Sequence, residues 1–160
     1  MEAIYFGSAD AGLNHGGDGD GPWIMADLEA GLWGADVKES HEPSISHAFV
    51  TAMVKGDSSA NTQGKGRWAI KGGDAATGGL TVYWDGARPN RSTVHTRRWL
   101  NSTDAPMSKQ GAIILGIGGD NSNGAVGTFY EGCMTQGFAT DSTDAAVQAN
   151  IVAAGYEYLG

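Results

Sequence analysis

Short apolar runs separated by glycine and polar turns recur along the chain, and this pattern predicts a series of β-strands. Each run is four to twelve residues long and is rich in β-branched or aromatic side chains. The predicted strands cover residues 3–6, 23–28, 44–55, 67–71, 80–84, 112–117 and 126–134.

The last predicted strand shows clear alternation, which places Val126, Thr128, Tyr130, Gly132 and Met134 on one face. Beyond it, residues 144–154 are predicted to form a helix. Val147, Ile151 and Ala154 recur there at helical spacing, Asp141 or Ser142 is the expected cap, and Gly155 the expected end.

Composition supports an all-β sandwich in a single domain spanning residues 1–160. Glycine accounts for 26 of the 160 residues, against an average usage of about 7%, and the glycines cluster in turns between runs. The segments 56–66 and 90–106 are predicted loops.

Charge and hydropathy narrow the possible partners. The net charge of −8 and only 10 Lys and Arg residues argue against nucleic acid, because binding to phosphates needs clustered cations. No apolar run approaches the roughly 20 residues of a membrane span. The first six residues lack a basic signal-peptide region and fit a strand instead.

Two carboxylates lie at the end of the predicted strand that begins at Trp23. On an extended chain Asp27 and Glu29 project from the same face, in register with Met25 and Trp23. Like charges at this distance raise the pKa of one group unless each has a partner. This arrangement suits acid–base chemistry, and it equally suits a solvent-facing polar stripe.

A third carboxylate follows the apolar run 112–117. Gly118 and Gly119 precede Asp120 at the end of this predicted strand, where backbone can approach a ligand closely. A carboxylate at a strand end can act as a general acid. The alternative is a hairpin turn in which Asp120 hydrogen-bonds to its own backbone.

Other chemistry is weakly indicated. Residues 18–20 and 120–123 resemble fragments of calcium loops but lack the complete spacing, so flexible turns are the better interpretation. The four histidines form no zinc-binding pattern, and we predict neither a metal nor a cofactor. The single cysteine, Cys133, excludes an internal disulfide and is predicted to be a buried small hydrophobe within its strand.

Taken in order, several segments resemble the α-L-arabinofuranosidase B family, glycoside hydrolase family 54. They include Gly21-Pro-Trp-Ile-Met-Ala-Asp-Leu-Glu29, Lys109 through Gly124 with its Gly-Ile-Gly-Gly-Asp-Asn core, and Gly127-Thr-Phe-Tyr-Glu-Gly132. The resemblance spans nearly all of the chain. It implies a concanavalin-like or laminin-G-like β-sandwich (a jelly roll) with one short C-terminal helix.

The resemblance also implies roles for particular residues. Glu29 matches the family's nucleophile and Asp120 its acid/base, in a reaction that releases terminal arabinofuranosyl groups with retention of configuration. The positions that match the sugar site, or lie beside it, are Asp27, Trp23, Gly119, Ala30 and Met1. The implied partner is an arabinose-containing polysaccharide or oligosaccharide, and the implied location is extracellular.

The chain also departs from the family pattern. The family domain is longer, and by the resemblance its missing half lies before Met1. Ala30 stands where the family has Asn, so one hydrogen bond to a sugar hydroxyl is lost. The loops 57–65 and 91–100 look expanded.

Three hypotheses therefore follow: a catalytic arabinofuranosidase, a non-catalytic carbohydrate-binding sandwich, or an inactive fragment of the enzyme. Strands without their usual neighbours would leave open edges, which favours self-association or a companion N-terminal half.

Overall fold

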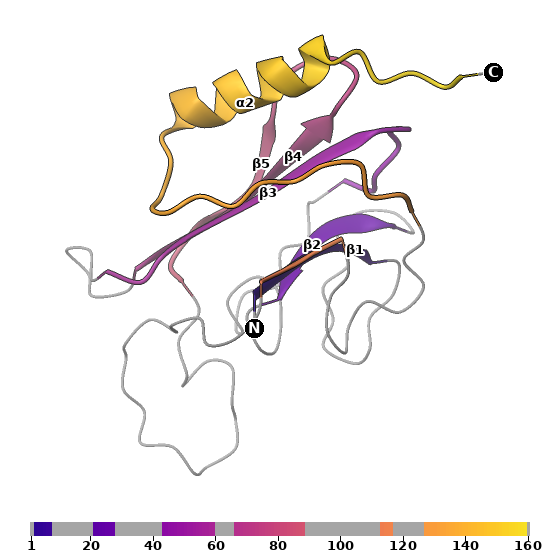
Figure 1. Cartoon of the computed structure of the whole chain (residues 1–160). Coiled ribbons are helices and arrows are strands. Elements are labelled where there is room, and N and C mark those ends of the chain that lie inside the picture. The colour runs from indigo at the N-terminus through magenta and orange to yellow at the C-terminus, as the bar shows by residue number, and fades with distance from the viewer. Residues whose placement is uncertain are drawn as a thin grey trace.

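A computed structural model of the chain describes residues 2–7, 21–27, 43–59, 66–88, 113–116 and 127–159. Within these ranges the secondary structure is mainly β, with one helix (Figure 1). The elements are β1 (Glu2–Gly7), β2 (Trp23–Asp27), β3 (Val50–Asp57), β4 (Arg67–Asp74), β5 (Thr81–Gly86), β6 (Ile113–Leu115) and α2 (Asp141–Ala153). No helix of the described ranges is long and apolar enough to cross a lipid bilayer.

The strands form two three-stranded sheets. In the first, the order is β2-β1-β6, with β1 antiparallel to β2 and parallel to β6. In the second, β3, β4 and β5 follow one another in antiparallel pairs, with an irregularity between Ile70 and Lys71 where β4 meets β5. The first sheet therefore joins segments that lie far apart in the sequence.

The two sheets pack face to face through apolar side chains. Trp68 and Ile70 alternate along β4 and are buried against the strands of the first sheet. Gly72 continues that face, and a methyl group added there would lie 2.0 Å from Cδ1 of Ile24 on β2. Figure 1 shows the resulting layers: α2 covers one side of the β3-β4-β5 sheet, and β1 and β2 lie on the other.

The predicted strands at 3–6, 23–28, 67–71 and 80–84 are present with shifts of a few residues, and β6 covers residues 113–115 of the predicted strand 112–117. The predicted strand 44–55 is only partly correct, because β3 begins at Val50. Before it, Ser44 Oγ accepts a hydrogen bond from Gly21 N, and Ile45 N donates to Pro22 O. These contacts tie residues 44 and 45 to the chain entering β2 rather than to a longer β3.

The predicted loop 56–66 was wrong at its start, since Gly56 and Asp57 pair with Trp68 and Arg67 and extend β3. Residues 60–65 and the whole of the predicted loop 90–106 lie outside the described residues.

The predicted strand 126–134 was also wrong over its described part. Residues 127–134 belong to no strand, and their side chains are exposed. The physical reason is that these residues form no ladder with any described strand, so the alternation does not separate a buried face from an exposed one. Cys133 is accordingly exposed, not buried as predicted.

The helix α2 forms where the sequence indicates but uses different ends and a different face. Thr140 is the N-cap, and its side chain accepts a hydrogen bond from Thr143 N, whereas Asp141 is the first helical residue. Gly155 ends the helix as predicted, with a positive φ of 71°. The fully buried side chains are Asp144 and Gln148; the predicted apolar residues are half-buried or, at Ala154, exposed.

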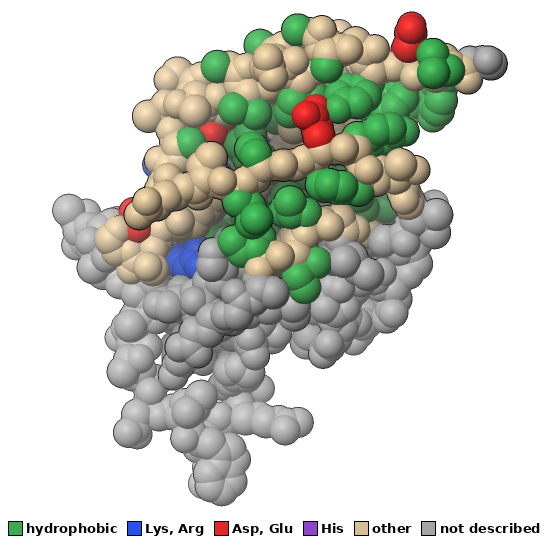
Figure 2. Space-filling view, in the orientation of Figure 1, with side chains coloured by type: hydrophobic (Ala, Val, Ile, Leu, Met, Phe, Trp, Pro, Cys, Tyr) green, Lys and Arg blue, Asp and Glu red, His purple; other side chains and the backbone are tan. Residues whose placement is uncertain are grey.

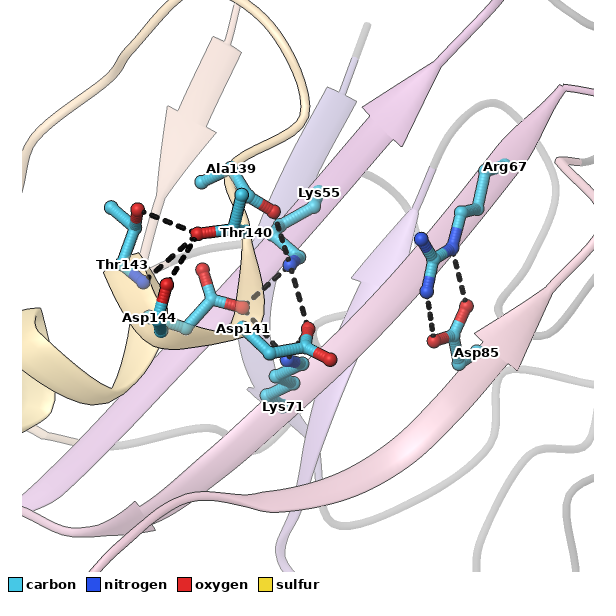
Figure 3. A network of polar contacts seen from close by, with 10 residues as sticks. Lys55, Arg67, Lys71, Asp85, Ala139, Thr140, Asp141, Thr143 and Asp144 are labelled. Atoms are coloured by element: carbon cyan, nitrogen blue, oxygen red, sulfur yellow. Dashed lines mark hydrogen bonds and ion pairs between the residues drawn. The ribbon is translucent and has the colours of Figure 1, made fainter.

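A buried ion-pair network fastens α2 to the sheet (Figure 3). Lys55 on β3 and Lys71 on β4 both reach Oδ2 of Asp144, at 2.5 and 2.7 Å. Lys71 also bonds Asp141 at 2.8 Å, and Lys55 donates to the carbonyl of Ala139 at 2.9 Å. Because Lys55, Lys71 and Asp144 are 7%, 5% and 2% exposed, each charge depends on its partners in place of water.

The pKa values follow from this geometry. Burial by itself raises the pKa of Asp144, but the hydrogen bonds from Lys55 and Lys71 outweigh it and hold that pKa below 3.8. Burial likewise lowers the pKa of Lys71, yet the hydrogen bonds to Asp141 and Asp144 leave it above 10.5. Lys71, Asp141 and Asp144 therefore keep their charges across the neutral range.

We expect Asp144→Ala to lower the free energy of unfolding by about 3–5 kcal/mol, because it leaves two buried ammonium groups without their shared carboxylate. Chemical denaturation followed by circular dichroism measures this loss. Asp141→Ala is the matched control: it removes the same group from the same helix at a solvent-exposed position, so its loss should be much smaller. Equal losses in the two variants would contradict a buried anchor.

The same network predicts a pH dependence. A carboxyl group whose folded pKa is depressed contributes stability above its unfolded pKa and loses it as the pH falls through the folded value. The pKa values of Asp141 and Asp144 lie below 3.8, so the free energy of unfolding should fall as the pH drops below about 4. Denaturation curves from about pH 7 to pH 2 test this, and Asp144→Ala should show a shallower acid slope than the unmodified chain.

Candidate active site

The strand β2 carries the first candidate segment into the sheet. Ile24 points toward β4, where it meets Gly72, so Trp23 and Met25 lie on the other side of β2 by alternation. Trp23 and Met25 are nevertheless 7% and 4% exposed and belong to the core cluster. Asp27 is the last residue of β2 and pairs with Ala3 of β1.

The strand β6 leads toward the second candidate segment. Ile114 lies opposite Ala3 on β1, so Asp27, Ala3 and Ile114 form one row across the three strands. Gly116 follows β6 with a positive φ of 85°, and its N–H donates to the carbonyl of Ile4 at 2.8 Å. The sheet thus brings the ends of both candidate segments to opposite sides of one central strand.

The structure covers only part of the predicted site. Trp23 lies on β2, and so does the backbone of Asp27. The other predicted site residues, Met1, Glu29, Ala30, Gly119 and Asp120, lie outside the described residues. The closeness of the Glu29 and Asp120 carboxyl groups therefore stays a prediction.

The directions of β2 and β6 constrain the predicted closeness of the Glu29 and Asp120 carboxyl groups. Because β2 is antiparallel and β6 parallel to β1, β2 exits past the beginning of β1 while β6 runs toward its end. The two strands flank β1, so they are about 10 Å apart at the shared row. Glu29 follows β2 after one intervening residue, whereas Asp120 comes four residues after Gly116, whose φ is positive.

The polar network beneath α2 was missed by the sequence analysis, and it is a poor candidate for catalysis. The pKa values of Asp141 and Asp144 are lowered and that of Lys71 is raised, so none of these groups exchanges protons readily near neutral pH. The signal in the sequence was a lysine at an interior position of each of two apolar strands, where an unpaired charge is costly.

Beside it, Arg67 and Asp85 form a two-bond ion pair between β4 and β5 (Figure 3), with nitrogen–oxygen distances of 2.9 and 2.6 Å. The hydrogen bond from Arg67 lowers the pKa of Asp85. Arg67 also lies over the ring of Phe138, as does Lys55. This ring links the exposed ion pair to the buried network, and the whole arrangement is structural.

The described part of the chain is thus an all-β protein of two packed sheets with carboxylate-bearing segments leaving one of them. Comparison with known proteins then identifies its family. The family model described as "Alpha-L-arabinofuranosidase B, catalytic" matches residues 1–157. The chain belongs to the α-L-arabinofuranosidase B catalytic family.

Curated relatives agree with this assignment. The chain is 53% identical over 158 residues to a probable α-L-arabinofuranosidase B of Aspergillus clavatus, and equally so to an α-L-arabinofuranosidase of Hypocrea jecorina. Each match covers 98% of this chain but 28% of the relative. The chain therefore spans less than a third of the length of the relatives that it matches.

Solved structures of arabinofuranosidases also superpose on this chain. A glycoside hydrolase family 54 α-L-arabinofuranosidase soaked with a cyclic sulfate inhibitor superposes with a TM-score of 0.73 at 52% identity, covering 98% of this chain and 29% of the other. An arabinofuranosidase complexed with arabinofuranosyl-α-1,2-xylobiose gives the same values.

The position of β2 depends on the absence of a side chain at Gly72. We expect Gly72→Ala to cost about 1–3 kcal/mol of stability, because its methyl group would meet Ile24, the ring of Tyr83 and the carbonyl of Thr51 within 3 Å. Thermal unfolding measures the loss. Gly79→Ala is the matched control, since no atom lies within 4 Å of its added methyl group. A melting temperature unchanged in Gly72→Ala would contradict the packing of the two sheets described above.

Proposed function

We propose that this chain supplies the two catalytic carboxylates of a retaining α-L-arabinofuranosidase, with Glu29 as nucleophile and Asp120 as acid/base. The family match over residues 1–157 carries the proposal. The fold supports it, because β2 and β6 flank one strand and the chain leaves each of them toward one of the two carboxylates.

The proposed mechanism needs a different protonation state of each carboxyl group. Glu29 is ionised when it attacks the anomeric carbon, and Asp120 holds a proton that it gives to the departing glycosidic oxygen. In the second step Asp120 takes a proton from water as the water oxygen attacks the anomeric carbon. The bond between that carbon and Glu29 breaks, and arabinose leaves with the configuration retained. The two carboxyl groups must then lie about 5–5.5 Å apart.

That distance requires the chain after β6 to turn back. A straight continuation of β6 would carry Asp120 toward the end of β1, away from the side on which β2 exits. The positive φ of Gly116 begins a change of direction that an L-residue would resist. Within the proposal, the glycine-rich run before Asp120 serves this reversal and lets the backbone of Gly119 approach the sugar.

The substrate follows from the family and the relatives. We propose terminal α-L-arabinofuranosyl groups of arabinan or arabinoxylan as the substrate. The sugar site is proposed to include the positions of Asp27, Trp23, Gly119, Ala30 and Met1, of which Ala30 offers no side-chain hydrogen bond. A solved relative holds arabinofuranosyl-α-1,2-xylobiose, and a Trichoderma koningii relative is named an arabinofuranosidase/B-xylosidase. Such polymers lie outside cells, and we propose an extracellular site of action. We also propose that the two sheets are parts of the family's concanavalin-like jelly roll.

The test is hydrolysis of an aryl α-L-arabinofuranoside by the purified chain. We expect Glu29→Ala and Asp120→Ala each to lower the rate by about 10²–10⁴-fold, the usual contribution of a catalytic carboxyl group. Proton NMR of the first-formed sugar in the unmodified protein should show retained configuration.

Asp85→Asn is the matched control for loss of a carboxylate, because Asp85 lies on β5 in a surface ion pair and should leave the rate unchanged. Equal rates in the unmodified chain and both site variants would dismiss the catalytic assignment. Binding of arabinan without any hydrolysis would instead favour the carbohydrate-binding alternative.

A further inference from the structure

The helix α2 is attached to the β3-β4-β5 sheet through a polar layer. Its two buried side chains are Asp144 and Gln148, whereas its apolar side chains are half-buried or exposed. Within the described ranges, the apolar core between the sheets is built from strand residues and Ile45, and α2 contributes none of its members. In Figure 2 the outward side of α2 carries scattered hydrophobic side chains without a continuous apolar stripe. Separation of α2 from the sheet would therefore expose much less apolar surface than separation of the two sheets.

The polar contacts of α2 are concentrated around its first turn (Figure 3). Oδ2 of Asp144 is shared by Lys55 and Lys71, and Lys71 also bonds Asp141. Just before the helix, the carbonyl of Ala139 accepts a hydrogen bond from Lys55. We call Lys55, Lys71, Asp141 and Asp144 the α2 anchor. Because Asp144 is the buried carboxylate that both lysines reach, the anchor depends on its negative charge.

The next turn of the helix adds an incompletely bonded contact. Gln148 donates to the carbonyl of Asp74 at 2.7 Å, but its Oε1 has no hydrogen-bond partner among the described residues. On the same face of β3 as Lys55, the buried Oγ1 of Thr51 has none among them either. Buried polar groups without partners cost free energy that contact with water returns. Beyond the anchor, the interface therefore gains little from staying closed.

The charged groups in and beside the anchor come from three strands and from the helix itself. They are Lys55 on β3, Lys71 and Arg67 on β4, Asp85 on β5, and Asp141 and Asp144 on α2. Arg67 and Asp85 bond each other. Loss of the charge on Asp144 would leave both lysines with Asp141, whose side chain is 78% exposed and lies 3.6 Å from Lys55. An exposed carboxylate compensates buried charges poorly.

Two glycines lie on either side of the helix. Gly137 and Gly155 have φ angles of 90° and 71°, and a methyl group added at either would meet no atom within 4 Å. Glycine adopts both signs of φ at little cost, so the backbone can change direction at both points. Beyond the second glycine, Tyr156 stacks on Phe49 with 5.5 Å between ring centres. The segment 138–154 can therefore move while the chain after it stays packed.

We propose that the segment 138–154 is an acid-sensitive flap: protonation of Asp144 releases it from the β3-β4-β5 sheet while the two sheets stay packed. The contacts between the sheets are apolar, as at Ile24, Trp68 and Ile70, so protonation leaves them unchanged. The flap lies on the side of the β3-β4-β5 sheet away from β1 and β2 (Figure 1). The inference is therefore independent of the proposed catalytic function.

The direction of the pH effect follows from the anchor. In the closed form the two lysines hold the pKa of Asp144 below 3.8, whereas in the open form contact with water restores its ordinary value. The open form therefore binds a proton more readily, and closure loses free energy as the pH falls below about 4. Asp141, whose pKa is also lowered, adds to the same trend.

Hydrogen–deuterium exchange followed by mass spectrometry tests the proposal on the full chain, from about pH 7 to pH 2. After correction for the intrinsic exchange rate at each pH, we expect protection of the α2 amides to fall below about pH 4. The slope should be about ten-fold per pH unit for each proton taken up. Amides of β1, β2 and β4 should keep their protection until the whole chain unfolds at lower pH.

Two matched variants separate the anchor from general effects. Asp144→Asn removes the charge and keeps the shape of the side chain, so protection of the α2 amides should fall by about a hundred-fold or more already at neutral pH. Asp141→Asn makes the same change at an exposed position of the anchor and should lower that protection much less. Protection of the sheet amides should stay unchanged in both variants.

Three results would overturn the proposal. Loss of protection in α2 and β4 at the same pH would show that the helix opens only with the whole fold. Equal losses in Asp144→Asn and Asp141→Asn would show that the buried charge does not hold the helix. Loss of protection in the sheets of Asp144→Asn at neutral pH would show that the flap does not open separately.

Discussion

The two sheets approach each other closely at Gly72, a position of β4 without a side chain. Gly72 leaves room for Ile24 of β2, and Trp68 and Ile70 fill the same face earlier along β4. The β2-β1-β6 sheet meets the second sheet through this approach of β2 to β4 and through the packing of β1 against β3. The proposed nucleophile Glu29 and the proposed acid/base Asp120 follow β2 and β6 of this sheet by two and five residues in the sequence.

The opposite face of the β3-β4-β5 sheet is covered in a different way. There α2 is held by charge rather than by an apolar stripe: Asp144 is shared by Lys55 and Lys71, and Gln148 donates to the backbone carbonyl of Asp74 at 2.7 Å. Buried pairs of this kind add little net stability over an apolar contact of the same shape. They do, however, tolerate only one arrangement, so the network fixes where the helix begins and which face it presents.

Family membership gives these features a context. A chain that matches 28% of its relatives' length carries the segments that resemble both catalytic carboxylates, and its described surface includes an extended segment without a ladder.

The sequence by itself determined the β-class, most strand positions, the end of the helix at Gly155 and the family, because these depend on local alternation, turn chemistry and long matching segments. Only the tertiary structure decided the rest. No local pattern could show that β6 pairs with β1, that Asp144 and Gln148 are the buried side of the helix, or that residues 127–134 pair with no described strand. Each of these depends on contacts between residues distant in sequence, and a period of two or of 3.6 residues carries no information about which partner a face will meet.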